Sequence, residues 1–174
     1  MIMNMKKLKK GQKGFSLVEL VIVVALAGLV GVAITATAFQ VFTFTTRISN
    51  QMTAIRQVQQ AGFWVSPDVM MSNTTKINVN PGGGKFLVLG WTAHDDKAHE
   101  VIYSLVDISG GLARLQREHK IDSTLNSTTT VAEYIDSAET SCDWDGKVLT
   151  FNVTATVGGR SETRTYEVKP RQGT

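Results

Sequence analysis

The fold is decided by residues 14–39, which read GFSLVELVIVVALAGLVGVAITATAF. Residues 20–39 of this stretch contain no formal charge, and eleven of them are Leu, Ile, Val or Phe. Twenty helical residues span ~30 Å, the thickness of the hydrocarbon core of a bilayer. On the insertion scale, eleven such side chains contribute roughly −3 to −7 kcal/mol. The stretch therefore predicts a helix that spans a membrane.

The charge of the chain changes sign just before this stretch. Residues 1–14 carry five lysines and no acid, whereas the rest of the 174 residues hold 13 basic and 15 acidic side chains. The five are Lys6, Lys7, Lys9, Lys10 and Lys13. Lysines keep their side of a span in the cytoplasm, so we expect everything after about residue 42 to lie outside it. The remainder has no basic run, and no nucleic-acid binding is predicted.

One carboxylate stands at the start of the apolar run. Glu19 lies between Val18 and Leu20. A carboxylate carried to mid-bilayer costs up to about 3 kcal/mol, and acids inside membranes usually have a partner. One interpretation is that Glu19 reaches the headgroups and complements the helix dipole. The other is that it pairs with a cation in the assembled protein.

The segment KGFSLVEL, residues 13–20, resembles the start of type IV prepilins and type II secretion pseudopilins, which have a short basic leader before an unbroken apolar helix. The resemblance implies that a prepilin peptidase cuts between Gly14 and Phe15 and N-methylates the new amine of Phe15. It implies that Glu19 pairs with the terminal amine of a neighbouring subunit and sets the register of filament growth. The implied partners are prepilin peptidase, other pilin or pseudopilin subunits, assembly-platform membrane proteins and membrane lipid.

A conventional secretory signal is the competing interpretation of the N-terminus. Ala36-Thr37-Ala38 is a small-residue cleavage site, and cutting there would leave Phe39 first. Three features oppose this interpretation: the apolar stretch is too long, an acid interrupts its front, and apolar residues continue beyond the site. The first residue of the mature protein distinguishes the two.

The helix is expected to continue beyond the membrane as an amphipathic helix. Apolar or small residues recur at spacings of three and four, which places them on one face that packs on a sheet. They are Ile48, Met52, Ile55, Val58, Gly62 and Val65. Ser66-Pro67 predicts the end of the helix at about residue 65. The expected division is a leader at 1–14, an assembly helix at 15–44, its continuation at 45–66 and a β-rich extracytoplasmic head at 67–174.

The rest of the chain predicts an antiparallel sheet, so the fold class is α+β and pilin-like. Expected strands are residues 85–91, 100–106, 111–118, 147–157 and 161–169. Gly-containing turns at 109–111 and 158–159 indicate hairpins. Residues 120–140, rich in Ser and Thr, predict a surface loop with a short strand near 131–135.

Part of the head is similar to the larger minor pseudopilins of the J type. The matching features are Y-x-L at residues 103–105, L-x-R at 112–114 after a glycine turn, and VKPR at 168–171. This similarity implies a minor subunit of the tip complex that primes assembly.

Three places in the head contain residues that can carry chemistry. Asp143-Trp144-Asp145-Gly146 has the order found inside a calcium loop, but a hairpin turn at Asp145-Gly146 is favoured. The residues His94, Asp95, Asp96 and His99 could ligate a metal, although ordinary loop composition is the simpler interpretation, and His119 has no evident partner. Cys142 is expected as a free thiol packed in the head. No cofactor, metal or enzymatic motif is predicted.

Two functions from different classes remain. The favoured one is a structural subunit of a type IV pilus or type II secretion pseudopilus, with one pass through the cytoplasmic membrane and the head outside. The alternative is a membrane-anchored binding or adhesion module that keeps its leader and never polymerises. The sequence does not distinguish a secretion pseudopilus from a type IV or DNA-uptake pilus.

Overall fold

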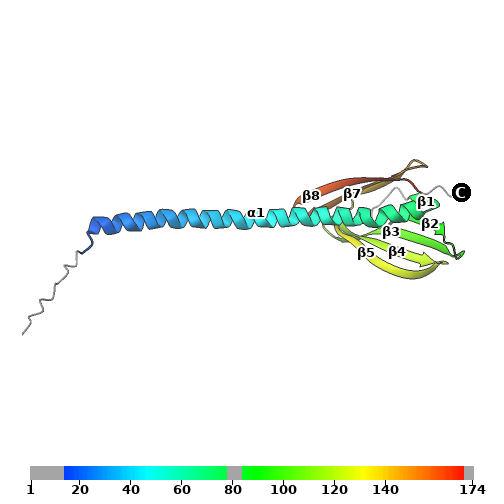
Figure 1. Ribbon diagram of the computed structural model, residues 1–174, viewed down its shortest axis with the longest axis horizontal. Coiled ribbons are helices and arrows are strands. Elements are labelled where there is room, and N and C mark those ends of the chain that lie inside the picture. The colour runs from blue at the N-terminus through cyan, green and yellow to red at the C-terminus, as the bar shows by residue number, and fades with distance from the viewer. Residues whose placement is uncertain (1–13, 78–83, 171–174) are drawn as a thin grey trace, which may run out of the picture. The chain divides into compact units, whose positions relative to one another are not determined.

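The computed structural model describes residues 14–77 and 84–170. Helix α1, Leu17–Met71, is followed by a β-sheet of eight strands (Figure 1). The chain divides into two compact units, one ending at Phe44 and the other beginning at Thr45. The second unit holds the C-terminal part of α1 and the whole sheet. One long N-terminal helix packed on an antiparallel sheet confirms the predicted α+β class.

The sheet is antiparallel throughout, and most neighbours in space are neighbours in sequence. The strands are β1 Thr74–Ile77, β2 Gly84–Thr92, β3 Ala98–Ser109, β4 Leu112–Ile121, β5 Thr124–Asp136, β6 Ser141–Trp144, β7 Leu149–Val157 and β8 Arg160–Val168. Strands β1 to β5 follow one another as a meander. The sheet then passes to β7, and the β5–β7 pairing is limited to Ile135 with Ala155.

Strand β7 connects the two parts of the sheet. Its whole length pairs with β8, so β6 and the end of β5 share its other edge. Strand β6 also contacts β1, which begins the meander. The sheet therefore curls around the C-terminal part of α1, with β7 and β8 on one side of the helix and β3 to β5 on the other (Figure 1).

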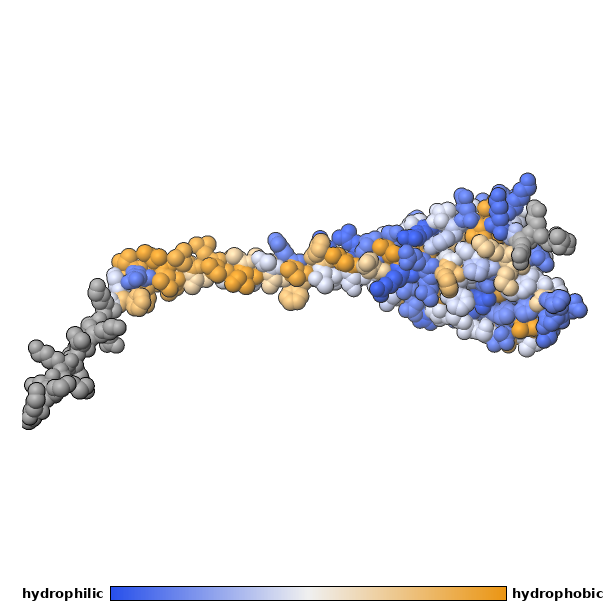
Figure 2. All heavy atoms as spheres, in the orientation of Figure 1, coloured by the Kyte–Doolittle hydropathy of each residue, from blue (hydrophilic) through white to orange (hydrophobic). Residues whose placement is uncertain are grey.

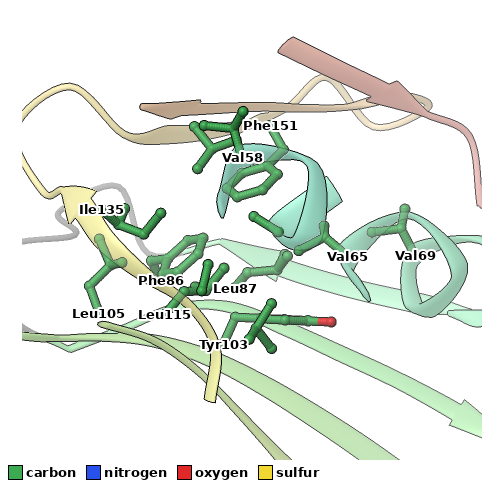
Figure 3. Close-up of a cluster of buried hydrophobic side chains, with 14 of the residues drawn as sticks. Val58, Val65, Val69, Phe86, Leu87, Tyr103, Leu105, Leu115, Ile135 and Phe151 are labelled. Carbon is green, nitrogen blue, oxygen red and sulfur yellow. The ribbon is translucent and has the colours of Figure 1, made fainter. Parts of the chain in front are cut away.

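The core lies between the buried face of α1 and the inner face of this sheet. Val58, Val65 and Val69 of the helix belong to one buried cluster with Phe86, Tyr103 and other side chains of the sheet (Figure 3). Val58 and Val65 are fully buried, as the predicted stripe requires. The stripe is wrong at its N-terminal end, because Ile48 is 46% exposed and Met52 is 53% exposed. At this level the sheet contacts another side of the helix, since Gln51 donates to Glu162 of β8 at 3.2 Å, and Ala54 is the first buried residue of α1.

The helix does not end at about residue 65, as Pro67 had indicated, but at Met71. Proline removes one N–H from the helix, yet Pro67 lies on the exposed side, where water solvates the carbonyl that loses its donor. Asp68 and Val69 on the opposite side are buried. Contacts of the last turn with the sheet therefore outweigh the local preference of the residue before proline.

The glycine turns were predicted correctly. Gly110 and Gly111 both have positive φ and join β3 to β4, and Gly158 and Gly159 do the same for β7 and β8. Two-residue hairpin turns of type I′ need positive φ at both positions, which glycine adopts without strain.

The strand expected near 131–135 is present, but the loop predicted around it is not, because β5 occupies 13 residues of the region 120–140. The turn before β5 is Asp122-Ser123, and both residues have positive φ although neither is glycine. The Asp122 carboxylate accepts a hydrogen bond from the Ala98 amide at 3.0 Å, which helps to hold this turn. A hairpin without glycine leaves little trace in sequence, and Thr-rich strands resemble loops in composition.

Candidate functional site: the helix start and the polar clusters of the head

The predicted processing site lies just before the helix. Gly14, Phe15 and Ser16 are not helical, and α1 begins at Leu17. The amide of Leu20 donates to the carbonyl of Ser16 at 3.1 Å, which is the first hydrogen bond of the helix. Phe15 is 80% exposed, and a Cβ at Gly14 would meet no atom within 4 Å. The bond between Gly14 and Phe15 is thus in an open, non-helical segment.

Glu19 lies in the first turn of α1 and is exposed. Among residues 14–77 and 84–170, the structure records no hydrogen bond or ion pair for its side chain. The Ser16-to-Glu19 spacing is that of a capping box, in which an acid near the helix N-terminus is favourable. The leader lysines, Lys6, Lys7, Lys9, Lys10 and Lys13, lie outside the described residues.

The first unit presents an apolar surface along the helix. Its large side chains, such as Leu20 and Val32, are more than half exposed, and Figure 2 shows hydrophobic residues covering this part of α1. The helix is long and apolar enough to cross a membrane. Thr35, Thr37 and Thr43 donate their hydroxyls to carbonyls four residues earlier, at 2.8 to 2.9 Å. These bonds satisfy polar groups that would be costly in lipid.

A buried ionic cluster joins the end of α1 to the sheet. Asp68 accepts from Arg117 Nε at 2.7 Å and from Arg117 Nη2 at 2.9 Å, and also from the Tyr103 hydroxyl at 2.5 Å. Trp64 lies 5.4 Å from the guanidinium carbon of Arg117. Burial and the Asp68 carboxylate raise the pKa of Tyr103, so the phenol stays a donor. The hydrogen bonds to Asp68 raise the pKa of Arg117. The cluster has a structural role, because its hydrogen bonds hold the last turn of α1 to the sheet.

The structure separates His99 from His94, Asp95 and Asp96, the residues that the sequence offered as possible metal ligands. His99 lies on β3 and its Nδ1 is 3.0 Å from Nε2 of His119, on β4. His119, which had no evident partner in sequence, is therefore half of a histidine pair. Asp95 pairs instead with Lys97 at 3.3 Å in an exposed loop. Among the residues the structure describes, no three His, Cys, Asp or Glu side chains come together as metal ligands.

Asp145 and Gly146 form a turn between β6 and β7, as favoured from the sequence. The Asp145 carboxylate accepts from the amides of Val148 at 2.6 Å and Lys147 at 2.7 Å, and Gly146 has a φ of 90°. These backbone hydrogen bonds lower the pKa of Asp145. The turn geometry gives the Asp145 oxygen a structural role.

Cys142 is a free thiol, as expected, and it packs against the core. Burial, with the neighbouring Asp143 carboxylate, raises its pKa to about 12. The thiolate is the reactive form of cysteine, so this environment opposes nucleophilic chemistry at Cys142.

Comparison with known protein families found one match in this chain. Residues 9–35 match the family model of the prokaryotic N-terminal methylation motif. This is the leader signature of prepilins and pseudopilins, and it supports a type IV pilin- or pseudopilin-type precursor that prepilin peptidase processes. The signature favours a structural subunit, and the match stops within the apolar part of α1. No curated protein and no solved structure matched the chain.

Proposed function

We propose that the chain is the precursor of a subunit of a type IV pilus or type II secretion pseudopilus. The observation that carries the proposal is the methylation-motif match over residues 9–35, which coincides with the start of an exposed, membrane-length helix. Prepilin peptidase cuts between Gly14 and Phe15 and methylates the amine of Phe15. The helix then serves as membrane anchor before assembly and as packing surface within the filament.

The proposed cleavage changes the charge at the membrane surface. All five leader lysines leave with residues 1–14, and a single amine remains on Phe15. The open segment at Gly14 supports this step, because a residue without a side chain fits an extended backbone into a peptidase cleft. Removal of the positive flank also removes the charges that retain the N-terminus at the cytoplasmic face.

Glu19 is the proposed assembly residue. It follows Phe15 by four residues, about one helical turn, and it is exposed with no recorded partner among the described residues. A carboxylate and an ammonium in an apolar medium attract strongly, and each is costly alone. Pairing of Glu19 with the Phe15 amine of an adjacent subunit would fix the axial register. The assembly-platform proteins of the membrane would deliver each subunit to that position.

The head is proposed to lie outside the cytoplasm, as the lysine distribution indicates. A minor role at the filament tip is the finer proposal, and it rests on the limited similarity of the head to J-type pseudopilins. The sheet and the C-terminal part of α1 share one core and form one compact unit, which provides a self-contained module for such a position.

The mature N-terminus tests the proposal. The full chain is produced with an active prepilin peptidase and, in parallel, with a catalytically inactive one, and intact mass and N-terminal sequence are measured. We expect a chain that begins at Phe15 and is one methylene heavier than the unmodified product, only with the active enzyme. A chain that keeps residues 1–14 in both samples supports the unpolymerised membrane module. A chain that begins at Phe39 supports a secreted domain. Either of these overturns the proposal.

A further inference from the structure

Three rings from three neighbouring strands meet on the inner face of the sheet, beyond the last turn of α1. Trp91 of β2 is paired in register with His99 of β3, and His119 of β4 is the diagonal neighbour of His99. The Trp91 centroid is 5.3 Å from that of His99 and 6.0 Å from that of His119, with planes inclined by 15° and 11°. The indole thus lies nearly parallel to both imidazoles and within stacking distance of each.

The two imidazoles meet edge to edge. Their nitrogens are 3.0 Å apart, whereas rings stacked face to face stay about 3.5 Å apart. Their centroids are 5.2 Å apart and their planes are inclined by only 23°. The contact is therefore a hydrogen bond close to the ring planes, with an N–H of one ring directed at the lone pair of the other.

This geometry fits a proton and does not fit a metal ion. A zinc ion lies ~2 Å from each imidazole nitrogen with tetrahedral angles, so two nitrogens on one ion are about 3.3 Å apart and both lone pairs are directed at the ion. The observed 3.0 Å is shorter, and no third carboxylate, thiol or imidazole joins the pair within residues 14–77 and 84–170.

The surroundings disfavour a doubly charged pair. Arg117 precedes His119 by two residues on the same face of β4, and Asp68 of α1, which is bound to Arg117, is the opposing acid. Burial, Arg117 and His99 lower the pKa of His119, and Asp68 raises it. Strand β5 contributes the neutral amide of Asn126, 3.5 Å from His119 Nδ1. Lys120 and Glu100 form an ion pair with each other at 3.9 Å, at positions that alternate away from the histidines.

We propose that the His99–His119 pair is a proton-sensitive support for Trp91, and that a second proton on the pair rearranges the groove that Trp91 lines. The groove lies at the end of the helix and is lined by Met70, Met71, Trp91, Glu167, Val168 and Lys169. A pair that shares one N–H between two nitrogens keeps the rings together. When both rings carry two protons, N–H faces N–H, the hydrogen bond is lost and two positive charges oppose each other beside Arg117. The rings separate, and the indole that contacts both moves with them.

The chemistry of the pair is independent of the proposed function. If the head lies outside the cytoplasm, the groove responds to external pH.

The test is a pH titration of the full chain in detergent micelles, with ¹⁵N-histidine and 5-fluorotryptophan labels. The imidazole signals and the Trp91 fluorine signal are followed from about pH 8 to about pH 5, the range in which histidines titrate. We expect His119 to protonate with a midpoint below the reference value of 6.5. We also expect the Trp91 signal to shift at the midpoint of the second protonation of the pair.

Two substitutions complete the test. His99→Gln should raise the midpoint of His119 and abolish the Trp91 shift that accompanies the second protonation. His94→Gln, in the exposed loop between β2 and β3, should change neither. The proposal is overturned if the Trp91 signal stays in place while both histidines protonate. It is also overturned if the midpoint of His119 is unchanged by His99→Gln. The wild-type titration decides the first point even if the variant does not fold.

Discussion

Asp68 and Arg117 form a two-pronged ion pair that joins the last turn of α1 to β4, across 49 residues of sequence. Their side chains are only 10% and 12% exposed, and Tyr103 donates a third hydrogen bond to the carboxylate. Bidentate, charge-assisted bonds of this kind fix orientation as well as distance. The pair explains why the helix continues past Pro67, since Asp68 reaches Arg117 from the turn that follows the proline.

Removal of one partner of this ion pair should destabilise the head. Arg117→Met leaves a buried carboxylate with Tyr103 alone, and we expect a loss of about 3 kcal/mol in the free energy of unfolding. Arg114→Met is the matched control on the same strand, because its 3.3 Å pair with Glu133 is about 40% exposed on both sides. The control should cost less than about 1 kcal/mol. Urea unfolding of the full chain in detergent, followed by circular dichroism, measures both.

The double variant Asp68→Leu, Arg117→Met separates the ion pair from general packing. Replacing both charges by apolar side chains should recover much of the loss, because no unpaired charge remains buried. If Arg117→Met and Arg114→Met cost the same, the ionic cluster has no special part in holding the helix end.

Replacement of Gly62 by a larger residue should destabilise the head by overpacking. A Cβ at this position would lie 2.1 Å from Cζ of Tyr166, whose hydroxyl donates to the Val58 carbonyl at 3.0 Å. Alanine normally stabilises a helix by about 1 kcal/mol relative to glycine, but overpacking costs about 1–3 kcal/mol. We expect Gly62→Ala to lower the stability, whereas Gln60→Ala on the exposed side leaves it nearly unchanged. The same urea unfolding measures the difference.

Tyr166→Leu tests the cause of that loss. In the Gly62→Ala background the smaller side chain should restore part of the stability, because the clash involves the ring. Stability losses that simply add in the double variant would show that the close approach of helix and β8 is not responsible.

The membrane helix and the glycine hairpins were predictable because their signals are local. A run of uncharged residues, a pair of glycines or Asp145-Gly146 each define structure over a few positions. The last helical turn, by contrast, depends on Asp68 meeting Arg117, and the histidine pair depends on the register of β3 with β4. These contacts join residues that are distant in sequence. The signal for them would have been His99 and His119 placed on one face of two paired strands, which requires both strand boundaries.

Stability should depend on pH through His119. Its pKa is lowered in the folded protein, chiefly by burial, so the unfolded chain binds its proton more readily. The contribution of His119 to the free energy of unfolding is therefore fully present above the reference pKa of 6.5. It decreases as the pH falls toward the folded-state pKa and stays constant below that value. The slope is at most about 1.4 kcal/mol per pH unit for one proton.

Unfolding experiments in urea between about pH 7.5 and about pH 5 measure this slope, since histidines titrate there. His119→Gln should flatten the curve, whereas His94→Gln should retain it. An equal slope in wild type and in His119→Gln would assign the pH dependence to other groups.

Glu19→Ala tests the assembly mechanism without disturbing the head, which lies in a separate compact unit. We expect insertion and cleavage after Gly14 to continue, because removing a charge does not make the span less apolar. Assembly should fall sharply, since an unpaired terminal amine buried among helices costs about 3 kcal/mol, equivalent to about a hundredfold in recruitment.

Two further variants separate the charge from other effects. Glu19→Gln, which keeps the size and loses the charge, should assemble as poorly as Glu19→Ala, whereas Thr37→Ala on the same helix should assemble normally. Sheared filaments and the membrane fraction are quantified by immunoblot, with the mature N-terminus checked by mass. Wild-type levels of filament from cleaved Glu19→Ala would refute the pairing of Glu19 with the Phe15 amine.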